Sequence, residues 1–137
     1  MEKILEQYGR VTVYMESNHP SPMYHVDGGV EPNPYGNLAV LLEDDNLEEV
    51  MYNGGAQCVK VAHRNHGMCR TNVWVDDQQG LEIAKNIAAF TSVPLGDGPG
   101  MVPIFDGRLP DGSRVNGTIP PVSPDGPTLT IRKFRED

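Results

Sequence analysis

The chain has 137 residues, of which 38% are hydrophobic and 22% charged, and its formal net charge is −8. This composition is that of one folded domain rather than of a disordered segment. The excess of negative charge disfavours binding of the whole molecule to nucleic acid or to anionic lipid. No apolar run approaches the roughly 20 residues of a membrane span, and residues 1–5 do not resemble a signal peptide. We therefore expect a cytoplasmic protein.

The first part of the chain predicts short strands separated by turns. β-branched and aromatic residues over 11–15 and 23–26 predict two strands, and residues 47–52 predict a third. The apolar run 38–42 is too short for periodicity to decide, and we expect a short helix packed on the sheet. Residues 1–37 are treated as a leading segment of the domain.

A hairpin is predicted from residues 58–64 and 67–75, with Asn65 and His66 as its loop. In that register Cys58 and Cys69 share a face of the sheet but lie four residues apart along the strands, roughly 13 Å. A disulfide requires Cα atoms within about 7 Å. We expect two reduced thiols.

One longer helix is predicted over residues 78–91. Asp76 is placed to cap its N-terminus, and Gln79 completes a capping box. The apolar face expected at helical spacing consists of Leu81, Ala84, Ile87, Ala88 and Phe90. Strands on both sides of a single main helix predict an α+β fold, with a mostly antiparallel sheet of about six strands covered on one face.

The last quarter of the chain, after the run 101–105, predicts a three-stranded meander with two Pro-Asp-Gly turns. If residues 110–112 form the first loop, Arg108 stands directly opposite Arg114. Two cations paired across a sheet repel each other unless an anion lies beside them. This arrangement indicates an anion site or an acidic partner surface. The plainer alternatives are pairing with Asp106 or Asp111, or side chains that extend into water.

Other chemistries have weaker support. His63, His66 and Cys69 are residue types that zinc prefers, but the predicted register places His66 in a loop and the other two on opposite faces. We therefore predict no metal site. Neither cysteine carries the local features of a nucleophile.

The glycine-rich stretches 28–29, 54–55 and 96–100 do not continue into the Lys-Ser or Lys-Thr of a P-loop. We therefore predict no ATPase activity from this chain alone.

Three segments of the tail, 106–116, 119–121 and 125–134, together resemble the junction segment of the type II/type IV secretion ATPases, which include pilus-assembly and archaellum motors. Upstream residues 49–54, 59–64 and 67–72 also fit, the last of these resembling the archaeal branch most. The resemblance covers roughly residues 38–134.

This resemblance implies a PAS-like N-terminal domain over residues 1–134, with 135–137 beginning a linker to a RecA-like motor domain. That motor domain would carry the P-loop, ATP and Mg²⁺, and the present chain would hold no cofactor itself. The implied partners are the motor domain, neighbouring subunits of a homohexamer and a membrane platform protein, and they do not include nucleic acid.

By the same resemblance, Arg108, Arg114 and Arg132 would contact the nucleotide phosphates. Arg132 could instead serve as a hinge or packing residue. The alternatives for the whole chain are a stand-alone docking scaffold for a secretion motor and a PAS-like small-molecule sensor.

Overall fold

The computed structural model describes residues 2–28, 35–54, 57–91, 93–96, 98–120, 123 and 126–134. Within these ranges nine strands form one sheet, in the order β1-β2-β3-β6-β5-β4-β9-β8-β7. The strands are β1 (Glu2–Tyr8), β2 (Val11–Glu16), β3 (Met23–Val26), β4 (Leu47–Tyr52), β5 (Cys58–His63), β6 (Gly67–Trp74), β7 (Ile104–Arg108), β8 (Arg114–Thr118) and β9 (Thr128–Arg132). The helices are a 3₁₀ turn η1 (Gly36–Leu38), α1 (Ala39–Leu42) and α2 (Asp77–Phe90).

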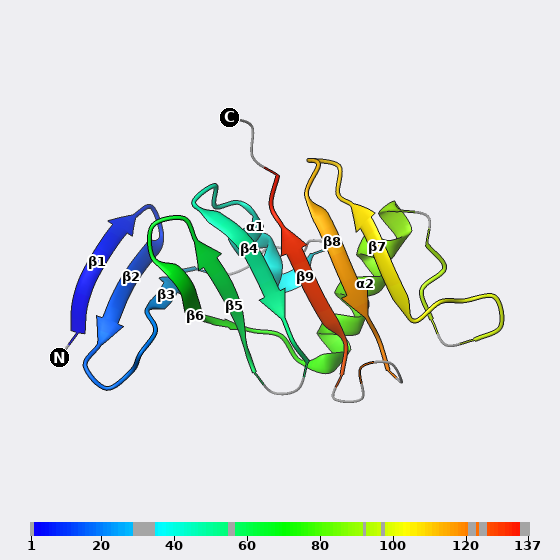
Figure 1. Ribbon diagram of the computed structural model, residues 1–137, viewed down its shortest axis with the longest axis horizontal. Helices are drawn as coiled ribbons and strands as arrows, with labels where there is room; N and C mark the ends of the chain where they lie inside the picture. The colour runs from blue at the N-terminus through cyan, green and yellow to red at the C-terminus, as the bar shows by residue number, and fades with distance from the viewer. Residues whose placement is uncertain are drawn as a thin grey trace.

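The sheet is antiparallel throughout except where β3 pairs with β6 in parallel. Both α-helices lie behind the sheet in Figure 1, and the side toward the viewer is called the open face below. The expected α+β class, with a mostly antiparallel sheet and its main helix on one face, is confirmed. The count of about six strands was wrong, since the described residues form nine. The PAS-like character stays a prediction.

The strand that sequence reasoning missed is β1, which occupies one edge of the sheet. Its sequence, EKILEQY, places charged and amide residues on both sides of the consecutive apolar pair Ile4 and Leu5, and Ile4 is 60% exposed. Its side chains therefore lack the buried alternation on which strand prediction depends. Within the described ranges, no helix combines the length and apolar character needed to cross a membrane.

The β5–β6 hairpin differs in register from the prediction. His63 pairs with Gly67, so the loop has three residues, and Gly67 takes the positive φ of 69° that this turn requires. Cys69 consequently pairs with Val61 on the core face, while Cys58 pairs with Trp74 on the other. The prediction of a shared face for the two cysteines is therefore wrong. The thiols are nevertheless free, as expected.

Helix α2 begins as predicted. The Asp76 carboxylate accepts from the Gln79 backbone amide at 2.8 Å, and the Gln79 side chain accepts from the Asp76 amide at 3.1 Å. The expected face was wrong at Phe90, which is 50% exposed. The buried positions are Gly80, Ile83, Ala84, Ile87 and Ala88, whose mostly small side chains let the helix lie close to the sheet.

The core lies between the sheet and the two α-helices. Along β8 and β9, Val115, Leu129 and Ile131 are fully buried. Successive side chains of a strand point to opposite faces. Burial of these three therefore places the neighbouring Arg114 and Arg132 on the open face.

Candidate anion site on the open face

Three arginines form one row across the open face. In the register of the sheet Arg108 pairs with Arg114, and Arg114 pairs with Arg132. The opposition of Arg108 and Arg114 predicted from the turn is confirmed. Neighbouring strands lie about 4.8 Å apart, so the row extends over roughly 10 Å. Below, the arginine row means these three residues.

The first Pro-Asp-Gly turn fixes the register of this row. The Leu109 amide donates to the Ser113 carbonyl at 2.8 Å, and the Ser113 amide donates to the Asp111 carboxylate at 2.8 Å. Gly112 has a φ of 94°, which a residue with a side chain adopts with difficulty. Asp111 thus contributes to the turn. The Ser113 hydroxyl accepts a hydrogen bond from the Phe134 backbone amide at 3.1 Å, which holds Phe134 against the same turn.

Two members of the row have acidic neighbours on the same face. The Arg132 Nε donates to a Glu49 carboxylate oxygen at 3.2 Å, and Glu49 is the partner of Arg132 in the register of β4 and β9. The Arg114 guanidinium lies 3.6 Å from the Asp106 carboxylate. Exposed pairs of this kind contribute little, typically about 0–1 kcal/mol.

Arg108 is bound less completely than its neighbours. Its guanidinium donates to the Gly112 carbonyl at 3.3 Å, and among the described residues no carboxylate pairs with it. The side chains of Arg132 and Arg114 are 73% and 58% exposed. Because a guanidinium has five N–H donors, the row keeps several donors for an incoming anion. A packing role does not fit the exposure of Arg132.

A hollow of about 490 Å³ opens at the Arg132 end of the row, lined by Glu48, Glu49, Ala62, Arg132 and Lys133. Lys133 is almost buried, and its ammonium donates to the Asp44 carbonyl. Burial lowers the pKa of Lys133.

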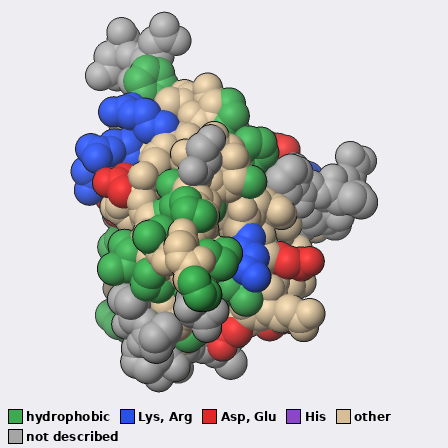
Figure 2. Space-filling model, turned by 90° about the vertical axis from the view of Figure 1, so that its right-hand side faces the viewer, with side chains coloured by type: hydrophobic (Ala, Val, Ile, Leu, Met, Phe, Trp, Pro, Cys, Tyr) green, Lys and Arg blue, Asp and Glu red, His purple; other side chains and the backbone are tan. Residues whose placement is uncertain are grey.

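Figure 2 views the molecule from the β7 edge and shows Lys and Arg side chains gathered at the margin formed by the open face.

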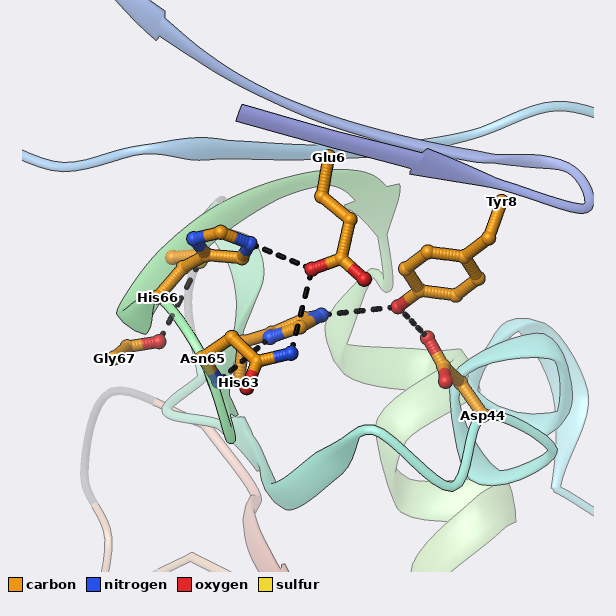
Figure 3. Close-up of polar contacts among 8 residues, drawn as sticks. Glu6, Tyr8, Asp44, His63, Asn65, His66 and Gly67 are labelled. Carbon is orange, nitrogen blue, oxygen red and sulfur yellow. Dashed lines mark hydrogen bonds and ion pairs between the residues drawn. The ribbon is translucent and has the colours of Figure 1, made fainter. Parts of the chain in front are cut away.

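A second polar cluster lies at the other end of the sheet and was missed by sequence reasoning. Glu6 of β1, His63 of β5 and His66 of the following turn point toward one another in Figure 3. Of the sequence-predicted metal candidates, His63 and Cys69 are both buried on the core side, so the prediction of opposite faces was wrong. The contact between Glu6 and the two histidines could not be predicted, because Glu6 lies on β1, the strand that was missed in the sequence.

Hydrogen bonds order this cluster. The Asn65 backbone amide donates to His63 Nδ1 at 3.1 Å, so Nδ1 is an acceptor and carries no proton. In a neutral ring the proton is therefore on Nε2, which lies 3.0 Å from the Tyr8 hydroxyl. Tyr8 and Tyr24 both donate to Asp44 at 2.6 Å. Burial acts to raise the pKa of Asp44, but these hydrogen bonds outweigh it and hold the pKa below its ordinary value. Burial lowers the pKa of His63.

Comparison with known proteins finds relatives in sequence but no protein-family model that matches. Three uncharacterized proteins of Methanocaldococcus jannaschii are similar: MJ0781 is 46% identical over 102 residues, MJ0900 is 40% identical over 103, and MJ1288 is 34% identical over 88. The matches cover 74%, 74% and 62% of this chain. They cover 14%, 18% and 33% of the relatives, so the chain spans a third or less of their length.

Among solved structures, the chain is similar to the VirB11 ATPase of the Brucella suis type IV secretion system, determined in complex with sulphate. The TM-score is 0.58 at 22% sequence identity, over 72% of this chain and 29% of that one. At this identity the likeness shows a shared fold.

Proposed function

We propose that this chain is the non-catalytic N-terminal domain of a secretion or pilus-assembly ATPase, and that its arginine row binds phosphates of a nucleotide held by a separate motor domain. The observation that carries the proposal is the register that places Arg108, Arg114 and Arg132 side by side on the open face. Cations aligned in this way repel each other, and a polyanion laid across them would remove the repulsion.

The chemistry of the row suits phosphate. A guanidinium presents a planar fork of donors that matches two phosphate oxygens, and charge-assisted hydrogen bonds of this type are stronger than neutral ones. Glu49 and Asp106 occupy some of the guanidinium donors through exposed contacts of 3.2 Å with Arg132 and 3.6 Å with Arg114. Such contacts are weak enough for a multiply charged anion to displace.

The comparisons support the same context. The solved neighbour is named an ATPase of a type IV secretion system and was determined with sulphate, a tetrahedral oxyanion. The sequence relatives are three to seven times longer than the part that matches, which leaves room for a motor domain in those proteins. We propose that the protein carrying this segment binds ATP and Mg²⁺ in such a domain, while the segment itself hydrolyses nothing.

The proposal extends to assembly. By its resemblance to the secretion ATPases, this domain would form part of a homohexameric ring at the cytoplasmic face of a membrane, next to its own motor domain, a neighbouring subunit and a membrane platform protein. In such a ring the arginine row would complete a nucleotide site at the cleft between the two domains.

The test is ATP turnover of the complete protein that carries this segment. Arg108→Ala and Arg114→Ala should each lower turnover by about 10²–10³-fold, which is at or below the lower limit of the range that arginine fingers contribute. Lys60→Ala is the matched control, because it removes an exposed cation from β5 on the same face but outside the row. Wild-type turnover in both arginine variants would overturn the phosphate role.

A further inference from the structure

The cluster at the β1 end of the sheet has the composition of a metal centre. We propose that Glu6, His63 and His66 bind one transition-metal ion of the zinc class, at a site separate from the arginine row. The three residues come from β1, from the end of β5 and from the β5–β6 turn. The ion would therefore join an edge strand to the centre of the sheet.

The ligand atoms are already gathered. His66 Nε2 lies 2.8 Å from Glu6 Oε1, and one nitrogen or oxygen atom of each residue lies within 4.8 Å of the others. Tetrahedral ligands at about 2.0–2.2 Å from zinc lie roughly 3.3–3.6 Å apart. Binding therefore requires the widest separation, which is at most 4.8 Å, to close by up to about 1.2–1.5 Å, and the 2.8 Å separation of His66 and Glu6 to open by about 0.5–0.8 Å. Side-chain rotation of Glu6 and His66 can supply both changes.

Burial strengthens the site without closing it. His63 is 1% exposed, and the side chains of His66 and Glu6 are 16% and 32% exposed. In Figure 3 the Glu6 carboxylate lies between His66 and Tyr8, above the ring of His63. Three protein ligands with partial exposure leave a fourth position for water.

The ligand types determine which ion fits. Two imidazoles and one carboxylate favour Zn²⁺, Co²⁺ or Ni²⁺. Mg²⁺ and Ca²⁺ prefer sites built from oxygen atoms, and this cluster offers too few of them. The Glu6 carboxylate also receives a hydrogen bond from the Asn65 side chain at 3.4 Å, which holds it toward the histidines.

Metal binding is coupled to the β5–β6 turn. In the structure the Asn65 backbone amide donates to His63 Nδ1, and the Nε2 proton faces Tyr8. An ion bound at Nε2 replaces that proton, so Nδ1 must become the protonated nitrogen and the Asn65 amide must turn away. The hydrogen bond from the Asn65 backbone amide to Nδ1 and the one from Nε2 to Tyr8 are both lost in the exchange, and we expect weaker affinity than in a closed structural zinc site.

The experiment titrates the 137-residue chain with Co²⁺ and Zn²⁺. Binding is measured by visible absorption, by calorimetry and by the NMR signal of the Asn65 backbone amide. We expect one ion per chain, a displaced Asn65 signal and no comparable response to Mg²⁺. His66→Ala and Glu6→Gln should each weaken binding by at least about tenfold, since even outer-shell changes cost 10–100-fold. These two positions are preferred because His63 is buried and its replacement could unfold the hairpin.

Two control variants separate this site from others. His25→Ala removes a histidine that lies 3.4 Å from Asp27, and Cys58→Ser removes the less buried thiol. Both should bind Co²⁺ as the wild type does. The proposal fails if His66→Ala binds as tightly as the wild type, or if either control loses binding to the same extent.

Discussion

Arg108 and Arg114 lie directly opposite each other on the neighbouring strands β7 and β8, and both side chains are on the open face. Like charges in this position destabilise a sheet by roughly 0.2–1 kcal/mol relative to neutral pairs. Arg132 continues the row on β9. We propose that the fold maintains this arrangement, at the cost of some stability, because the row binds an anion.

Replacing Arg108 with Gln should stabilise the 137-residue chain at low salt by about 0.2–1 kcal/mol, because the repulsion from Arg114 is removed. The gain should shrink as salt rises, since exposed charges are screened. Urea denaturation at two ionic strengths measures both effects. Arg10→Gln is the control: its guanidinium lies 4.0 Å from Glu43, so no gain is expected there. Lower stability of Arg108→Gln at every salt concentration would show that the row is not repulsive.

Glu49→Gln should strengthen binding of pyrophosphate to the chain. The Glu49 carboxylate accepts from Arg132 at 3.2 Å and must be displaced before an anion can take that guanidinium. Because an exposed pair contributes up to about 1 kcal/mol, the expected gain in affinity is up to about fivefold. Calorimetric titration measures it, with Glu82→Gln on α2 as a variant of equal charge. An unchanged or weaker affinity would mean that Glu49 does not compete for Arg132.

Gly80→Ala should destabilise the protein by about 1–3 kcal/mol, although alanine is the better helix former. A methyl group at this position would overlap the ring of Tyr52 and lie 3.1 Å from Pro127. Tyr52 has little room to move, because it is buried and its hydroxyl donates to Asp77 at 2.6 Å. Thermal and urea denaturation measure the loss. The same instruments should record no such loss for Gln78→Ala, an exposed position of the same helix.

The two thiols should differ in reactivity. Burial raises the pKa of the Cys69 thiol to about 11, so only about one part in a thousand is thiolate at pH 8. Cys58 is partly accessible. A thiol reagent at pH 8 should therefore modify one cysteine per native chain and two in denaturant, and Cys58→Ser should remove the native reaction. Equal rates for both thiols would contradict the core position of Cys69.

Turn chemistry and capping were the features that sequence could predict. The Pro-Asp-Gly turn determined the pairing of Arg108 with Arg114, and Asp76 with Gln79 identified the start of α2. Each depends on interactions between residues close in sequence, where the chemistry of a few side chains decides the geometry.

Features that depend on distant segments were not predictable. The place of Arg132 in the row depends on the register between β8 and β9, which are joined by the long segment 119–127. The contact between Glu6 and His66 spans 60 residues. The hairpin loop was one residue longer than expected, which reversed the faces assigned to Cys69 and its neighbours. A shift of one residue has this consequence because side chains alternate along a strand.

The phosphate-binding role of the arginine row can be tested by following its side chains while phosphate binds. With arginine Nε–H groups observed by NMR, pyrophosphate should shift the signals of Arg108, Arg114 and Arg132 in a saturable manner that weakens as salt rises. Arg10 and Arg64, exposed arginines outside the row, should move little. Shifts of similar size at all five arginines, or none in the row, would contradict the assignment of this face as a phosphate-binding surface.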